Sequence, residues 1–326
     1  MTSVPEKLLL AAPRGYCAGV DRAVQTVERA LELYGPPVYV RKEIVHNKHV
    51  VAKLRERGAV FVDQETEVPE GETVVFSAHG VAPTVHANAG ARSLKTIDAT
   101  CPLVTKVHVE AKKFAAGGYT VVLIGHAGHE EVEGTMGEAP DHIVLIETED
   151  DVDSLEVVDP DRVAFISQTT LSVDETRAII LKLREKFPNI TSPRTDDICY
   201  ATTNRQMAVR QMARECDLVL VIGSSNSSNS NRLVEVARDH GADSYLIDNE
   251  SQVEEEWLEG KRVVGISSGA SAPEELVQRL VGFFRERGTE EVSEFEVVQE
   301  NVRFMMPKEI RQAMADREPP ADPRDQ

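Results

Sequence analysis

The stretch DLVLVIGSSNSSNSNRLVEVA (residues 217–237) begins as an aliphatic run, passes through glycine into a string of Ser and Asn, and ends with apolar residues at helical spacing. Ser-rich segments usually act as flexible spacers. Here the string lies directly between a predicted buried strand and a predicted helix, where free amides and hydroxyls can face one anion. We therefore expect an ordered strand-to-helix junction rather than a linker.

The same alternation of strand and helix patterns recurs along the chain. Val20, Val24, Val27, Leu31 and Tyr34 form one apolar stripe at helical spacing. The alternation is typical of parallel α/β sheets, and since few strands are long, we expect several small units instead of one large sheet. The predicted strands are residues 7–12, 38–45, 73–78, 119–125, 142–147, 163–167, 217–223, 244–247 and 262–267.

Composition excludes several classes of protein. The 326 residues carry a net charge of −19, which argues against general binding to nucleic acid or to a membrane surface. No apolar run approaches the roughly 18 residues of a membrane span, and the N-terminal apolar run is too short for a signal peptide. We expect a soluble, cytoplasmic protein whose charged, Pro-rich tail, ADREPPADPRDQ (residues 315–326), is disordered.

Three of the four cysteines stand at predicted strand-to-helix junctions. Cys17 precedes the Val20 helix, and Pro102 marks a first helical position, which makes Cys101 the expected N-cap. Cys199 lies just before another helix. Helix N-termini favour the thiolate form of cysteine, which is the form that binds metals.

Two finer predictions concern this last helix. Thr202 or Thr203 is expected to cap it. Cys216 falls one turn after Met212 on its apolar stripe, so we expect Cys216 to be a core residue.

The spacing of the three junction cysteines leaves the metal open, because no Cys-x-x-Cys pair occurs. Three thiolates could hold zinc with an open fourth position. They could equally hold an iron–sulfur cluster in which one iron lacks a protein thiolate.

Histidines and acids follow several of the predicted strands. Imidazoles are good partners for phosphate oxygens and for proton delivery, and His46, His79, His126 and His129 all come after predicted strands. Beside His129 lie Glu130, Glu131 and Glu133, which either form the acidic first turn of a helix or include a proton donor.

Hydroxyl side chains complete the polar set. Thr169 ends a predicted strand. Ser172 with Glu175, and Ser271 with Glu274, have the spacing of capping boxes, and a capping serine can also face an anion.

Nine segments together resemble the 4-hydroxy-3-methylbut-2-enyl diphosphate reductase (LytB/IspH) family. They run in order over nearly the whole chain, leaving only the acidic tail outside the resemblance. The segments are PRGYCAGVDRAV, EIVHNKHVV, FSAHGV, DATCPLVTKVH, LIGHAGHEEVEGTMG, SQTTLSVDET, DDICYATTNRQ, GSSNSSNSNRL and SGASAPE.

The resemblance implies an α/β fold of three similar small units with mainly parallel sheets around a central iron–sulfur cluster, each unit contributing one cysteine. We expect residues 1–100, 101–197 and 198–290 to form these units, and residues 291–326 to form a C-terminal segment and tail. The resemblance also implies one [4Fe–4S] cluster per chain, with the substrate hydroxyl at the iron that lacks a cysteine. The implied site residues are Cys17, Cys101 and Cys199 for the cluster; His46, His79, His129, Ser227, Ser228, Asn229 and Ser271 for a diphosphate; Glu131 as proton relay; and Thr169 near the substrate hydroxyl.

The implied activity is the reductive dehydroxylation of 4-hydroxy-3-methylbut-2-enyl diphosphate to isopentenyl and dimethylallyl diphosphate, with electrons from ferredoxin or flavodoxin. This is the last step of the non-mevalonate (MEP) isoprenoid pathway. Two alternatives remain at this point. A zinc-dependent hydrolase would use the three thiolates and a bound water, and a non-catalytic iron–sulfur sensor would not depend on Glu131.

Overall fold

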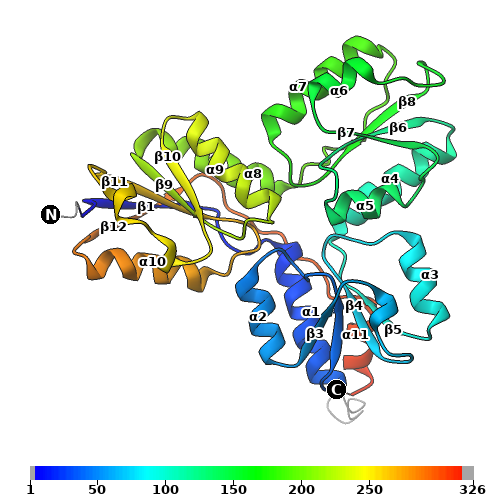
Figure 1. Cartoon of the computed structure of the whole chain (residues 1–326), viewed down its shortest axis with the longest axis horizontal. Helices are drawn as coiled ribbons and strands as arrows, with labels where there is room; N and C mark the ends of the chain where they lie inside the picture. The colour runs from blue at the N-terminus through cyan, green and yellow to red at the C-terminus, as the bar shows by residue number, and fades with distance from the viewer. Residues whose placement is uncertain (1–3, 318–326) are drawn as a thin grey trace, which may run out of the picture.

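The computed structural model describes residues 4–317, so most of the tail predicted to be disordered lies outside the described residues. Three sheets, each with helices packed around it, surround a common centre (Figure 1). Every strand pairing among the named strands is parallel. The predicted α/β fold of three units is therefore confirmed. Within the described range, no helix combines the length and apolar character that crossing a membrane requires.

The first unit has a four-stranded sheet in the order β3-β2-β4-β5. The apolar stripe of its long helix, including Val27 and Leu31, packs against Val38 and Val40 of the sheet. Its elements are α1 (Ala18–Tyr34), β2 (Val38–Arg41), α2 (Lys48–Glu56), β3 (Ala59–Val62), a 3₁₀ turn η1 (Glu65–Glu67), β4 (Thr73–Phe76), α3 (Pro83–Ala91), β5 (Lys95–Asp98) and α11 (Lys308–Ala315).

The second unit has a three-stranded sheet in the order β7-β6-β8. Its core lies on both faces of β6. Val122 and Ile124 belong to the apolar cluster on one face, and Val121 and Leu123 belong to the cluster on the other. Its elements are α4 (Pro102–Ala116), β6 (Thr120–Ile124), α5 (Glu130–Met136), β7 (Ile143–Ile146), α6 (Glu149–Ser154), β8 (Val163–Ser167) and α7 (Val173–Lys186).

The third unit has a five-stranded sheet in the order β10-β9-β11-β1-β12. Its elements are β1 (Lys7–Ala12), α8 (Tyr200–Met212), η2 (Ala213–Glu215), β9 (Leu218–Ile222), α9 (Ser228–Asp239), β10 (Asp243–Ile247), η3 (Glu250–Gln252), η4 (Glu255–Leu258), β11 (Val263–Ser268), α10 (Glu274–Glu286) and β12 (Glu291–Glu296).

The membership of β1 corrects the expected residue ranges. Residues 1–100 were expected to form one unit, but β1 pairs with β11 and β12 of the third sheet. Leu8 and Leu10 are buried there against Val264 and Ile266. Burial of an apolar strand decides which sheet it joins, and sequence order does not.

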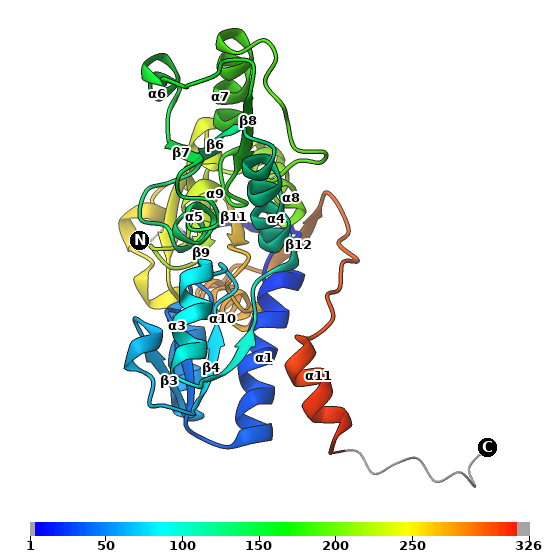
Figure 2. The same ribbon diagram turned by 90° about the vertical axis from the view of Figure 1, so that its right-hand side faces the viewer.

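The C-terminal part of the chain also differs from expectation. β12 joins the third sheet, and α11 packs on α1 of the first unit (Figure 2). The sequence patterns missed β3, β5 and β12. β12 (EVSEFE) lies at the edge of the sheet and half of its residues are glutamates, so no apolar run marks it.

Over residues 4–317, the chain passes from one unit to another at four places, and three of these passages carry a cysteine. Cys17 lies between β1 of the third unit and α1 of the first. Cys101 lies between β5 of the first unit and α4 of the second, and Cys199 between α7 of the second and α8 of the third.

Candidate active site

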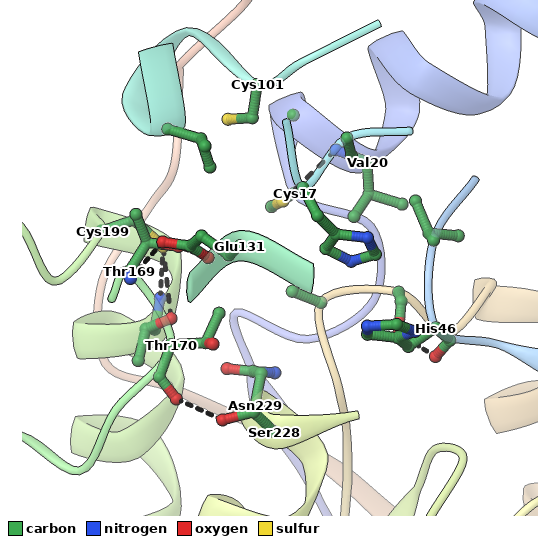
Figure 3. A pocket seen from close by; sticks show the side chains of 18 of the residues that line it. Cys17, Val20, His46, Cys101, Glu131, Thr169, Thr170, Cys199, Ser228 and Asn229 are labelled. Atoms are coloured by element: carbon green, nitrogen blue, oxygen red, sulfur yellow. Dashed lines mark hydrogen bonds between the residues drawn. The ribbon is translucent and has the colours of Figure 1, made fainter. Parts of the chain in front are cut away.

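A cavity at the centre of the molecule is lined by side chains from all three units (Figure 3). Apolar residues, including Val20, Val45 and Val104, line it together with polar side chains. The structure places every predicted site residue on it: Cys17, His46, His79, Cys101, His129, Glu131, Thr169, Cys199, Ser227, Ser228, Asn229 and Ser271.

Each of the three passage cysteines is the N-cap of the helix that follows it. The Cys17 sulfur accepts a hydrogen bond from the Val20 amide at 3.5 Å, and the Cys199 sulfur accepts one from the Thr202 amide at 3.4 Å. The predicted cap at Thr202 or Thr203 was therefore wrong. The sulfur of Cys199 takes the acceptor role that a hydroxyl would have had, and both threonines lie inside α8.

Cys216 is a core residue, as predicted, although it is not on a helix. It is 8% exposed and packs with Val209 and Met212 in the core of the third unit. α8 ends at Met212. A 3₁₀ turn, η2, follows, and Cys216 comes after that turn with an extended backbone.

The thiols of Cys17 and Cys101 approach each other across Gly19. A Cβ atom added at Gly19 would lie 2.7 Å from the Cys101 sulfur and 3.8 Å from that of Cys17, so only glycine fits there. All three passage cysteines are free thiols.

At least one pair of these sulfurs nevertheless lies more than 4.8 Å apart. Two thiolates on a single zinc ion are at most about 4.6 Å apart, twice the Zn–S bond length. Among residues 4–317, the ligand atoms that all lie within 4.8 Å of one another come from His46, His79 and Glu130, and the three thiols are not such a set. A site of several metal atoms fits the thiols better than a single ion.

Burial changes the protonation expected of these thiols. It raises the pKa of Cys101 to about 12 and that of Cys199 to about 11, against the opposing effect of backbone amides at the helix starts. At Cys101 and Cys199 the helix N-terminus alone therefore does not produce a thiolate, contrary to our expectation. A bound cationic centre would have to supply the stabilisation.

Three histidines form one wall of the cavity, which we call the histidine wall (His46, His79 and His129). The rings of His46 and His79 stack with centroids 4.0 Å apart, and His129 meets both edge-on. Burial and the neighbouring imidazoles lower the pKa of His46, and lower that of His129 to about 3. Nδ1 of His129 accepts the Glu131 amide at 3.1 Å, which leaves the proton of the neutral ring on Nε2.

Two carboxylates, Glu130 and Glu43, lie behind this wall. Glu130 was a candidate proton donor in the sequence, and no sequence pattern singled out Glu43. Glu130 Oε2 lies 3.1 Å from Nδ1 of His79, and Glu43 Oε2 lies 3.3 Å from Nδ1 of His46. Burial opposes ionisation of Glu130, but the hydrogen bond and charge of His79 outweigh it, so its pKa is lowered. The hydrogen bond with His46 lowers the pKa of Glu43. A carboxylate at Nδ1 accepts the proton of that nitrogen, so Nε2 is an acceptor in the neutral ring and becomes a donor only when the ring is protonated.

The Ser/Asn string is an ordered junction, as predicted. Ser227 is the N-cap of α9, and Ser228 donates to the Thr170 carbonyl at 2.9 Å. Asn229 is 4% exposed, and both polar atoms of its side chain lack a hydrogen-bond partner. Its amide points into the cavity (Figure 3). Buried amides without partners are rare, and this one is placed for a ligand.

The cavity is suited to an anion although its lining contains no Lys or Arg among the described residues. The donors available are imidazoles, hydroxyls, amides and the N-terminus of α9. Ser271 contributes differently from expectation. The N-cap of α10 is Pro273, while the Ser271 hydroxyl donates to the His46 carbonyl at 2.9 Å and so ties the third unit to the histidine wall. Ser172 caps α7, as predicted.

Glu131 lies on the opposite wall, held by Thr169. Oε1 of Glu131 accepts the Thr169 amide at 2.7 Å, and Oε2 accepts the Thr169 hydroxyl at 2.9 Å. The carboxyl is 2% exposed, and burial raises its pKa to about 7 despite these hydrogen bonds. The Thr169 carbonyl accepts the Cys199 amide at 3.0 Å, so this acid is fixed close to a cysteine passage. Such a group can hold or release a proton near neutral pH.

Comparison with known proteins agrees with this geometry. Residues 8–285 match the family described as LytB protein. A 4-hydroxy-3-methylbut-2-enyl diphosphate reductase from Rhodococcus jostii is 60% identical over 94% of this chain and 92% of its own, and one from Acidothermus cellulolyticus is 57% identical over 98% and 96%. The solved E-1-hydroxy-2-methyl-but-2-enyl-4-diphosphate reductase of Plasmodium falciparum superposes with a TM-score of 0.93 at 38% identity, covering 96% of this chain and 99% of that one. The chain belongs to the LytB family.

Proposed function

We infer that this protein reduces 4-hydroxy-3-methylbut-2-enyl diphosphate to isopentenyl and dimethylallyl diphosphate, the last step of the non-mevalonate isoprenoid pathway. The reaction consumes two electrons and two protons, breaks the allylic C–O bond and releases water. The observation that carries this inference is the convergence of three cysteines, three histidines and one buried acid on one cavity.

The family is iron–sulfur dependent. We propose that Cys17, Cys101 and Cys199 hold a [4Fe–4S] cluster that leaves one iron without a protein thiolate. The separation of the three sulfurs and their capping positions support a cluster over a single zinc ion. Such a cluster supplies single electrons and a Lewis-acidic iron when bound.

The histidine wall and the start of α9 hold the diphosphate in this proposal. In the free protein, burial keeps His46 and His129 largely neutral. A diphosphate would restore their positive charge, because an adjacent anion favours the protonated imidazole. Asn229 gains the hydrogen bonds that its buried amide lacks.

Glu131 delivers a proton in this proposal. Hydroxide is a poor leaving group, so departure of the substrate hydroxyl needs an acid beside it. With a pKa of about 7, Glu131 is substantially protonated at neutral pH, and Thr169 fixes its direction. The apolar residues Val20, Val45 and Val104 suit the carbon skeleton of the substrate.

The deciding experiment is anaerobic iron and sulfide analysis combined with a reductase assay on the diphosphate substrate. Cys17→Ser, Cys101→Ser and Cys199→Ser should each lose most of the cluster, whereas Cys216→Ser, the matched control in the core, should keep it. Colourless protein that contains zinc would favour the hydrolase. An intact cluster without turnover, unaffected by Glu131→Gln, would favour the sensor.

The electrons are proposed to come from ferredoxin or flavodoxin. These carriers deliver one electron at a time, so two encounters serve each turnover.

A further inference from the structure

The segment of residues 297–307, which we call the C-terminal strap, crosses from β12 in the third unit to α11 in the first (Figure 2). One end of it is anchored by a fully buried arginine. Arg205 donates to Glu300 Oε1 at 3.0 Å, to the Gly15 carbonyl at 2.8 Å and to the Ala201 carbonyl at 3.1 Å. Gly15 and Ala201 are each two residues from a passage cysteine.

The other end of the strap is anchored in the same way. Arg22 donates through Nε to the Met305 carbonyl at 2.7 Å and through Nη1 to the carbonyls of Ala99 and Thr100, both at 3.0 Å. Thr100 directly precedes Cys101. The strap is thus joined by single arginine side chains to all three cysteine passages, and the residues that line the substrate cavity include none from it.

The outer side of the strap has an unusual surface for this chain. Met305 is 74% exposed and Val302 is 42% exposed, with Arg303 exposed between them. Residues 297–308 contain two cationic side chains, Arg303 and Lys308, and one acidic side chain, Glu300, which is paired with the buried Arg205, although the whole chain carries a net charge of −19.

We propose that Val302, Arg303 and Met305 form the docking surface for an acidic electron-carrier protein. The proposal rests on the proposed function, because that reaction needs two electrons from outside. Electron transfer slows steeply with distance, and substrate occupies the cavity, so the carrier must approach the cysteine passages from another side. The strap is hydrogen-bonded through Arg205 and Arg22 to the backbone beside all three cysteines.

The charges of the protein surface indicate why the carrier should be an acidic protein. An acidic carrier is repelled by most of this surface, and a local cationic patch directs it to one place. Exposed apolar side chains beside the cation supply the small contact area typical of transient electron-transfer complexes.

The test compares two electron sources in the cluster-loaded enzyme. With a reduced bacterial ferredoxin, Arg303→Glu should raise KM for the ferredoxin about tenfold and flatten its salt dependence. With reduced methyl viologen, which needs no docking surface, turnover should stay within about twofold, since the charge of Arg303 affects encounter and not chemistry. Arg285→Glu, on an exposed position of α10, makes the same charge change elsewhere and should leave KM unaltered.

Met305→Ser provides a second variant, because Arg22 binds the backbone carbonyl of Met305 and not its side chain. It should also raise KM for ferredoxin and spare the viologen rate. An unchanged ferredoxin KM in both variants, an equal rise in Arg285→Glu, or an equal loss with viologen would overturn the docking surface. Absence of viologen turnover in the unsubstituted protein would instead overturn the proposed function.

Discussion

Glu130 and Glu131 are neighbours in the first turn of α5, yet the structure gives them opposite properties. Glu130 turns to the histidine wall, where His79 lowers its pKa. Glu131 turns to Thr169, where burial raises its pKa to about 7. One residue is a fixed negative charge that orients an imidazole, and the next is an acid able to give up a proton. Environments that push the pKa values of two adjacent carboxyls apart assign them different roles.

The largest effect should come from Glu131→Gln, which keeps the shape and removes the proton donor. We expect kcat to fall by about 10²- to 10⁴-fold, the usual contribution of a general acid. Binding of inorganic pyrophosphate should be retained, because the diphosphate is assigned to other residues. A wild-type kcat would remove Glu131 from the mechanism.

The pH dependence of the wild-type protein should follow the same residue. The active form of Glu131 is protonated and its pKa is about 7. If Glu131 is the acid, kcat should therefore be constant at lower pH and fall about tenfold per pH unit above 7. Glu130→Gln should keep this midpoint. A midpoint near the ordinary glutamate pKa in the enzyme–substrate complex would contradict the assignment.

Glu130→Gln should act on binding instead of chemistry. Loss of the charge behind His79 weakens the imidazole as a partner of the diphosphate, so KM should rise by about five- to tenfold with little change in kcat. Glu133→Gln, an exposed position on the same helix, is the matched control and should have no effect. Calorimetric measurement of pyrophosphate binding checks the result. A loss confined to kcat would contradict the assignment of Glu130 to binding and of Glu131 to proton delivery.

Thr169→Val should give the smallest change and sharpen the account of Glu131. It removes the hydroxyl donor to Oε2 and keeps the backbone donor to Oε1. Since the lost bond lowers the Glu131 pKa, the midpoint of the kcat–pH profile should move to higher pH. Thr169→Ser retains the hydroxyl and should restore the wild-type midpoint. A shift to lower pH would contradict this account.

The sequence was informative where one residue sets the local structure. Pro102 fixes the start of α4, so the N-cap position of Cys101 could be predicted. The glycine and the Ser/Asn string after β9 likewise marked the start of α9. In both cases the signal lies within a few residues of the feature.

The features that were missed depend on distant partners. β1 joins the third sheet because its leucines fit a core made by β11 and α10, which lie more than two hundred residues away. Glu130 looked like an ordinary acid at a helix start, and only its position beside His79 of another unit distinguishes it. Local spacing carries no information on such contacts.

The pairing of β1 with β12 has a consequence for synthesis of the protein. These neighbouring strands come from opposite ends of the chain. The third unit cannot close until β12 has left the ribosome, whereas the second unit is complete in sequence much earlier. Cys17 and Cys199 border this late-closing unit, so their final positions depend on a strand that is translated after both of them. Assembly of the three-cysteine site therefore requires β12 as well as the segments that carry the cysteines.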